Sequence, residues 1–98
     1  MLYRLNVHIP VSKEEEAGLD RLRAALEAEE AVDLGELRVH DGEDGERVVH
    51  VESTLDAPSA YHAAHVSGAD LYKRLLRDMG MEDRSITIAA DRAGDPAA

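Results

Sequence analysis

The sequence predicts an α+β domain built as a split β-α-β sandwich. Apolar and polar residues alternate with a period of two in four separate segments, which is the pattern of half-buried strands. Helical periodicity fills the interval between the first and second segments and the interval between the third and fourth. The resulting order, strand, helix, strand, strand, helix, strand, occupies nearly all of the 98 residues and favours one antiparallel sheet with helices on one face.

The first strand is expected from Tyr3, because every second residue from there to Val11 is apolar. Ser12 and Glu15 then form a capping box, since the serine hydroxyl can accept a hydrogen bond from the amide three residues on while the glutamate reaches back. A helix follows, and the acidic run 14–16 lies at its N-terminal end, where the helix dipole favours negative charge. Its inward-facing stripe comprises Leu19, Leu22, Ala25 and Leu26.

A hairpin is expected in the middle of the chain. The segments around Leu37 and Val51 alternate apolar and polar residues, and the link 41–46 between them contains only aspartate, glutamate and glycine. Such a link is typical of a turn between paired strands. With one helical region before this hairpin and one after it, the predicted fold class is a ferredoxin-like βαββαβ sandwich.

The second helical region is expected to begin after Asp56. Pro58 falls in its first turn, where proline is tolerated because the amide that it lacks has no helical partner there. Glycine lowers helix stability by about 1 kcal/mol relative to alanine, so the Ser67-Gly68 pair is expected to divide a short helix from a longer one. The inward-facing stripe comprises Ala60, Ala64, Leu71, Leu75 and Met79.

The last strand is marked by Ile86 and Ile88, so a single domain is expected over residues 1–90. Residues 91–98 are rich in small and polar side chains and are expected to form a disordered C-terminal tail. Met1 runs almost directly into the first strand. We therefore expect no secretory signal, and a cytoplasmic location is favoured.

The composition excludes several classes of partner and chemistry. A net charge of -10, with eleven basic residues that form no block, disfavours binding to nucleic acid or to an anionic membrane. The chain has no cysteine, which removes disulfides and thiolate chemistry. No apolar run approaches the roughly 20 residues of a membrane-spanning helix.

Size and layout favour a homodimer. A chain this short buries only about 60 to 65 per cent of its unfolded surface, and this one has no tryptophan or phenylalanine to add large buried areas. A single sheet with helices on one side also leaves its second face uncovered. Association of two copies would compensate for both features.

The second sheet face is expected to be polar and rich in histidine. His8 and His50 can approach each other, because the first and third strands are neighbours in this fold, and Glu52 is near enough to orient one of them. Three imidazoles on one face also fit a zinc or copper site, but alternating histidines are more often solvated or cross-strand partners, so we expect no metal site. The face comprises Arg4, Asn6, His8, Glu36, Arg38, His40, Val48, His50, Glu52, Ser85 and Thr87.

A second histidine pair, His62 and His65, has the spacing of neighbours on a helix surface. The 100° rotation per residue points His62 into solvent and places His65 at the edge of the apolar stripe, beside Tyr61 and Tyr72. His65 is therefore the better candidate for a residue facing a cleft between helix and sheet. The competing interpretation is an edge histidine that is hydrogen-bonded to backbone or water.

Several segments carry a family resemblance. Together with the opening strand and the glutamate-rich helix, they resemble the antibiotic-biosynthesis monooxygenase family of the dimeric α+β barrel superfamily, over about residues 2 to 90. The segments are Gly35-Glu36-Leu37, the stretch 46–52, Ala60-Tyr61, the stretch 64–67 and the stretch 71–75.

The resemblance implies a homodimer with facing sheets and a small-molecule pocket between helices and sheet. It implies a cofactor-independent monooxygenase or cyclase acting on an aromatic or polyketide-like substrate, in which His65 moves a proton and Asn6 hydrogen-bonds a substrate oxygen. Tyr61, Tyr72 and Glu52 would bind the substrate. We expect no cofactor, and the absence of tryptophan disfavours the haem-degrading branch.

Two departures weaken this assignment. The aromatic residue usual after the third-strand glutamate is replaced by Ser53-Thr54, and the spacing from His65 to Ser67 is one residue shorter than in the family. The competing class is a non-catalytic binding or assembly module that uses the polar, histidine-rich sheet face. The sequence leaves open whether the protein is an enzyme.

Overall fold

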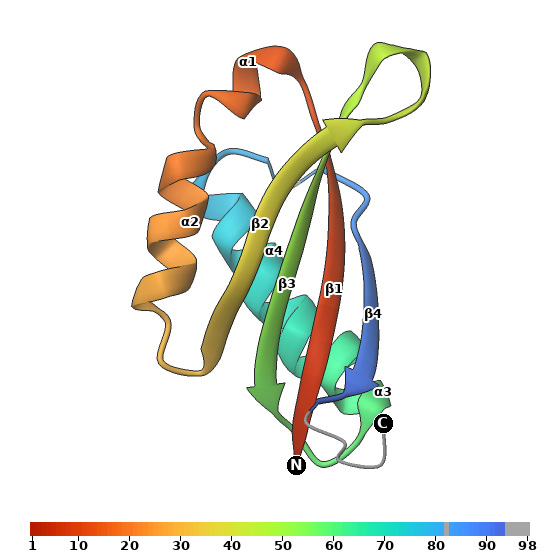
Figure 1. The fold of residues 1–98 in the computed structure, drawn as a ribbon. Helices are drawn as coiled ribbons and strands as arrows, with labels where there is room; N and C mark the ends of the chain where they lie inside the picture. The colour runs from red at the N-terminus through yellow and green to blue at the C-terminus, as the bar shows by residue number, and fades with distance from the viewer. Residues whose placement is uncertain (82, 94–98) are drawn as a thin grey trace.

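A computed structural model describes residues 1–81 and 83–93. Four strands form one antiparallel sheet in the order β2-β3-β1-β4, as Figure 1 shows. In that view α4 crosses behind the sheet and α2 lies beside β2. The α+β, ferredoxin-like fold class is therefore confirmed. The strands are β1 (Leu2–Val11), β2 (Val32–Asp41), β3 (Arg47–Asp56) and β4 (Thr87–Arg92).

The helical elements come in two groups, one on each side of the central hairpin. Within the described residues, no helix has the length and apolar character needed to cross a lipid bilayer. The first group is α1 (Lys13–Glu16) and α2 (Leu19–Ala28); the 3₁₀ turn η1 (Glu43–Gly45) lies in the hairpin; the second group is α3 (Ala60–His62), the π-helical turn η2 (Ala63–Ser67) and α4 (Gly68–Asp78).

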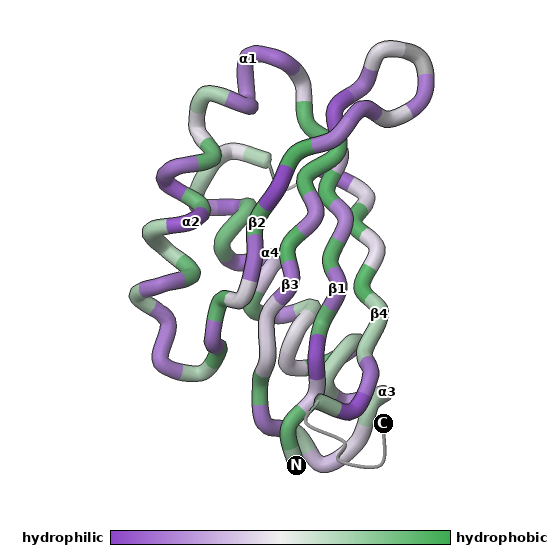
Figure 2. Tube along the Cα trace, viewed as in Figure 1, coloured by the Kyte–Doolittle hydropathy of each residue, from purple (hydrophilic) through white to green (hydrophobic). Residues whose placement is uncertain are grey.

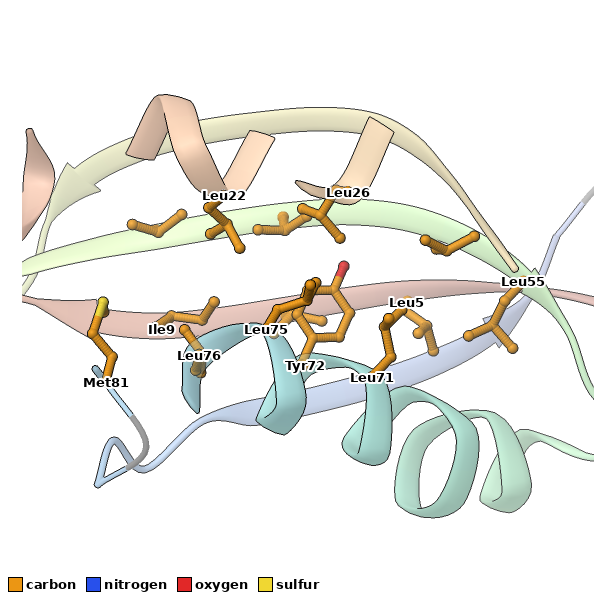
Figure 3. Packing of buried hydrophobic residues seen from close by; sticks show 14 of the residues in the cluster. Leu5, Ile9, Leu22, Leu26, Leu55, Leu71, Tyr72, Leu75, Leu76 and Met81 are labelled. Atoms are coloured by element: carbon orange, nitrogen blue, oxygen red, sulfur yellow. The ribbon is translucent and has the colours of Figure 1, made fainter. Parts of the chain in front are cut away.

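The sheet has one apolar and one polar face, as the alternating colours along β1 and β3 in Figure 2 show. In β1 the residues at odd positions from Tyr3 to Val11 are buried, and those between them are half-buried or exposed. Helices α2 and α4 cover the apolar face. Leu22 and Leu26 of α2 and Tyr72 of α4 meet the side chains of β1 there (Figure 3).

The predicted first helix forms as two pieces. The capping box is confirmed, because the Glu15 amide donates to Ser12 Oγ at 3.2 Å and the Ser12 amide donates to Glu15 Oε1 at 2.9 Å. However, α1 ends at Glu16, and α2 starts only after Gly18. Since α1 buries no residue, packing does not hold the two pieces in one continuous helix.

The helix is not broken at Ser67-Gly68, although the longer helix α4 does begin there as predicted. The chain remains helical through this pair, and what precedes α4 is the π-helical turn η2, which ends at Ser67. A side chain at Gly68 would start 2.3 Å from the carbonyl oxygen of Ala63 and 2.9 Å from Leu5 Cδ1. Glycine is therefore needed there for close approach. Ala60, expected on the inward stripe, is exposed because it lies before this turn and out of phase with α4.

Strand β4 ends later than the sequence predicted. It continues to Arg92, where the register pairs Asp91 with Arg4 and Arg92 with Tyr3 of β1. Asp91 and Arg92 therefore belong to the sheet and not to a tail. Ala93, also predicted in the tail, is still tied to β1, because its amide donates to the Leu2 carbonyl oxygen at 3.0 Å. Residues 94–98 of the predicted disordered tail lie outside the described residues.

Candidate functional site

The outer face of the sheet, which none of the described helices covers, brings three histidines together. His8 and His50 are register partners on β1 and β3. Their rings stack with centroids 4.5 Å apart and an angle of 6° between the planes. The ring of His40 on β2 lies edge-on to His8, with centroids 6.4 Å apart. The predicted approach of His8 and His50 is confirmed, and we call His8, His40 and His50 the histidine cluster.

His50 is fixed by a hydrogen bond across the strand pair. Its Nε2 lies 3.0 Å from Asn6 Oδ1, and because that oxygen only accepts, the imidazole nitrogen donates. Partial burial is the first cause that lowers the pKa of His50, followed by the adjacent His8 and the positive charge of Arg38. Both effects disfavour a second proton on the ring. His50 is therefore held as a neutral donor in the middle of the face.

Glu52 has a different partner from the one the sequence suggested. Its carboxylate accepts from Arg4 Nε at 3.1 Å instead of orienting a histidine. On the same face Arg38 pairs with Glu36 at 3.5 Å. The outer face thus carries two cation–carboxylate pairs beside the histidine cluster. Among the described residues, no group of three or more His, Cys, Asp or Glu side chains is placed to hold a metal ion.

His65 lies on the other side of the sheet, in the π-helical turn. Its ring packs against Tyr61 with centroids 4.8 Å apart and the planes tilted by 40°. Both side chains are exposed, Tyr61 at 71%. His65 also lines a hollow of about 180 Å³ together with Lys73 and Ile88. The predicted position beside a space between helix and sheet is thus present, although the hollow is small and open to solvent.

Tyr72 is not beside His65 as the helical rotation suggested. It is fully buried in the core, where its hydroxyl shares a 2.8 Å hydrogen bond with Ser53 Oγ. Burial raises the pKa of Tyr72 to about 12. His62, expected in solvent, is half-buried and shares a 3.0 Å hydrogen bond between its Nδ1 and Ser67 Oγ. Tyr72 is therefore a core residue and His62 a local brace of the π-helical turn.

The five residues predicted for one site fall into three places. Asn6 and Glu52 lie on the outer face, Tyr72 lies in the core, and Tyr61 and His65 lie on the helical side. The sheet separates Asn6 from His65, so the two do not meet one substrate atom within a single chain.

Sequence reasoning missed two polar residues of interest. Ser53 stands in an inward-facing position of β3, where polar residues are unusual, and this position was the available signal for its buried hydrogen bond. Lys73 was overlooked because a lysine on a helix flank has no distinctive pattern. In the fold it lines two adjoining hollows beside the last strand.

Comparisons with known proteins show the fold alone. No protein-family model matches the chain, and no significant match was found among curated proteins. The C-terminal domain of the MgtC protein from Mycobacterium tuberculosis has a similar solved structure, with 12% identity, a TM-score of 0.62 and coverage of 97% of this chain and 94% of that domain. The de novo designed protein Foldit4 is also similar, with 17% identity, a TM-score of 0.61 and coverage of 93% and 97%. These neighbours agree with the ferredoxin-like fold, and the antibiotic-biosynthesis monooxygenase family is not confirmed.

Proposed function

We propose that this chain is a non-catalytic assembly module that forms a homodimer through the outer face of its sheet. The observation that carries the proposal is the histidine cluster, in which His8 and His50 are half-buried and stacked although no helix or strand among residues 1–81 and 83–93 covers them. An uncovered sheet face whose side chains are held by cross-strand contacts can pack against another sheet. The occupant that we propose is a second copy of the same face.

Charge balance supports self-association on this face. The chain has a net charge of -10, and two copies repel each other over most approaches. On the outer face, however, Arg4 is paired with Glu52 and Arg38 with Glu36, and the imidazole of His50 is held neutral. The face is thus locally close to neutral. It is a surface on which two acidic chains can meet without bringing like charges together.

Core composition gives a second reason for assembly. The buried core depends on aliphatic side chains and on two tyrosines, Tyr3 and Tyr72, because the chain has no tryptophan or phenylalanine. A small domain with few large side chains has a narrow margin of stability. Covering the outer sheet face with a second copy would bury side-chain area that the single chain leaves accessible to solvent.

The test is the mass in solution at neutral pH. Light scattering at micromolar concentration is expected to give a dimer, twice the 10.7 kDa of one chain. His50→Glu places a carboxylate in the middle of the face and is expected to give the monomer, whereas the matched change His65→Glu on the opposite side is expected to leave the dimer intact. A wild-type monomer at these concentrations would refute the proposal, as would equal dissociation by both variants.

A second candidate function, the binding of a small organic molecule beside His65, is supported by the hollow that this residue lines. The arrangement does not support a monooxygenase or cyclase, because Asn6 and Tyr72, which would contact the same substrate as His65, lie elsewhere in the molecule. Oxygen uptake with a panel of phenolic and polyketide-like compounds is expected to stay at the level of the buffer. Turnover lost in His65→Ala and kept in His62→Ala would instead establish the catalytic reading.

A further inference from the structure

Two hollows adjoin along the seam between α4 and the last strand. One, of about 220 Å³, is lined by Lys73, Leu76, Arg77, Arg84 and Ile86. The other is the hollow of about 180 Å³ beside His65. Because both are lined by Lys73 and Ile86, we treat them as two halves of one depression, which we call the α4–β4 groove. Small-molecule sites begin at roughly 300 Å³, a size that neither hollow reaches alone and that the two reach together.

The two ends of the groove differ in polarity and charge. The end near the π-helical turn is lined mainly by small and branched apolar side chains, from Ala64 and Ala69 on the helix to Ile88 on β4. The other end is flanked by the cationic side chains of Lys73, Arg77 and Arg84. A ligand that matches both ends has an apolar body and a negatively charged head.

The charge of the groove is opposite to that of the chain. The molecule carries a net charge of -10, yet no acidic side chain is found among the described residues that line the groove. Lys73 forms no ion pair within the described part of the chain and stands where the two hollows meet. Lys73 is exposed, so its ammonium group can reach an anion that settles in the groove, at the modest strength of a solvent-exposed ion pair.

Arg84 adds a second donor with unmet hydrogen bonding. It is paired with Glu15, which ties the segment before β4 to the first helical turn. Its Nε, however, is buried without a hydrogen-bond partner in the described structure and lies 3.6 Å from the Asp83 carboxylate, beyond hydrogen-bond range. Buried donors without partners are uncommon in folded proteins. Arg84 therefore keeps one N–H group that no acceptor in the described structure satisfies.

We propose that the α4–β4 groove binds a small amphipathic carboxylate. The carboxylate lies at Lys73, on the side of Arg84, and the apolar body extends over Ile86 and Ile88 toward Ala69. His65 closes the far end. This site lies on the helical side of the sheet and is independent of the homodimer proposed above, which uses the outer face.

Titration of the full chain with sodium octanoate, followed by two-dimensional amide NMR, tests the proposal. Shifts are expected at Lys73, Ile86 and Ile88 and not on β3. Lys73→Met keeps the length of the side chain and removes the charge, and we expect it to weaken octanoate about fivefold, the upper range for a partly exposed ion pair. Lys13→Met is the matched control because it removes the other lysine of the chain, outside the groove, and it is expected to change affinity less than twofold.

Two further arms separate charge from hydrophobic contact. 1-Octanol, which has the same apolar body without the carboxylate, is expected to bind at least fivefold more weakly than octanoate. Ala69→Glu places a carboxylate in the apolar end and is expected to abolish the shifts while the circular dichroism spectrum is unchanged. The proposal is overturned if octanol binds as well as octanoate, if Lys73→Met has no effect, or if the shifts map to the outer face.

Discussion

The two faces of the sheet differ although they are made by alternate residues of the same strands. On the inner face of β1, Leu5, Val7 and Ile9 are completely buried. On the outer face, Asn6 and His8 are half-buried, and each contacts a side chain of β3. The inner face is stabilised by close packing of apolar side chains. The side chains of the outer face are ordered by a hydrogen bond and by ring stacking between polar residues. Adjacent residues of one strand therefore have different surroundings, a close-packed core on one side and a polar surface on the other, which is the surface proposed above to meet a second copy.

The largest effect that tests this difference is expected from Leu5→Ala. Leu5 is 0% exposed and packs in the core, so removing its side chain should lower the free energy of unfolding by about 3 kcal/mol. Leu2→Ala is the matched control in the same strand, because Leu2 is 53% exposed, and should cost less than about 0.5 kcal/mol. Urea unfolding measures both. Similar losses for the two leucines would mean that the inner face is not the main source of stability.

The second effect concerns close approach at the inner face. Gly68→Ala should destabilise the fold by about 1–3 kcal/mol, since the added carbon would overlap the Ala63 carbonyl oxygen and Leu5 Cδ1. Helix propensity alone predicts the opposite sign, a gain of about 1 kcal/mol. Gly18→Ala is the control, because the added carbon there has ordinary contacts at 3.4 Å and 3.8 Å. A Gly68→Ala variant as stable as the wild type would show that glycine is not needed there for close approach.

The helix around Gly68 also shows which features of the fold could not be predicted from the sequence. Strict alternation in β1 and the Ser12–Glu15 capping box are local patterns, and the structure contains both. The close approach of Gly68 to Leu5, in contrast, joins residues far apart in sequence, and no local pattern predicts it or the π-helical turn beside it. The π-helical turn changes which residues share one face of the helix. The sequence prediction assumed a constant rotation of 100° per residue and therefore placed Tyr72 beside His65, whereas Tyr72 faces the core.

The candidate site shows the same limit. The approach of His8 to His50 was predictable, because strand order and alternation fix which residues are opposite each other. The partner of Glu52 was not, since Arg4, two positions along β1 from Asn6, competes with the histidines for its carboxylate. The α4–β4 groove could not be predicted from the sequence, because its residues come from distant segments and share no motif.

The third effect tests the polar contact between Ser53 and Tyr72 within the inner face. Tyr72→Phe should cost about 1–2 kcal/mol, because it leaves the Ser53 hydroxyl buried without its partner. The double variant with Ser53→Ala should recover part of this loss, since neither polar group then remains. Tyr61→Phe, whose ring is 71% exposed, is the matched control and should be neutral in thermal unfolding. A double variant less stable than the sum of the two single changes would contradict the assignment.

The smallest effect is expected on the outer face and depends on pH. Because the pKa of His50 is lowered in the folded chain, the unfolded chain binds a proton more readily. Stability should therefore be complete above the unfolded pKa of about 6.5, and it should fall as the pH drops from there through the lower folded value. Protons on His8 and His40, and the charge of Arg38, act in the same direction, whereas the carboxylate of Glu52 opposes them.

Urea unfolding at pH 7.5 and pH 5.0, at one fixed protein concentration, measures this dependence. His50→Gln should reduce the difference in midpoint between the two pH values, because glutamine keeps a donor for Asn6 and does not titrate. His65→Gln, an exposed histidine on the other side of the sheet, should leave the difference unchanged. If His65→Gln reduced it as much as His50→Gln, the pH response would not belong to the outer face. If only His50→Gln reduces the difference, the pH-sensitive part of the sheet is the histidine cluster, which is also the part proposed to meet a second copy. Acidification should then weaken the dimer before it unfolds the chain.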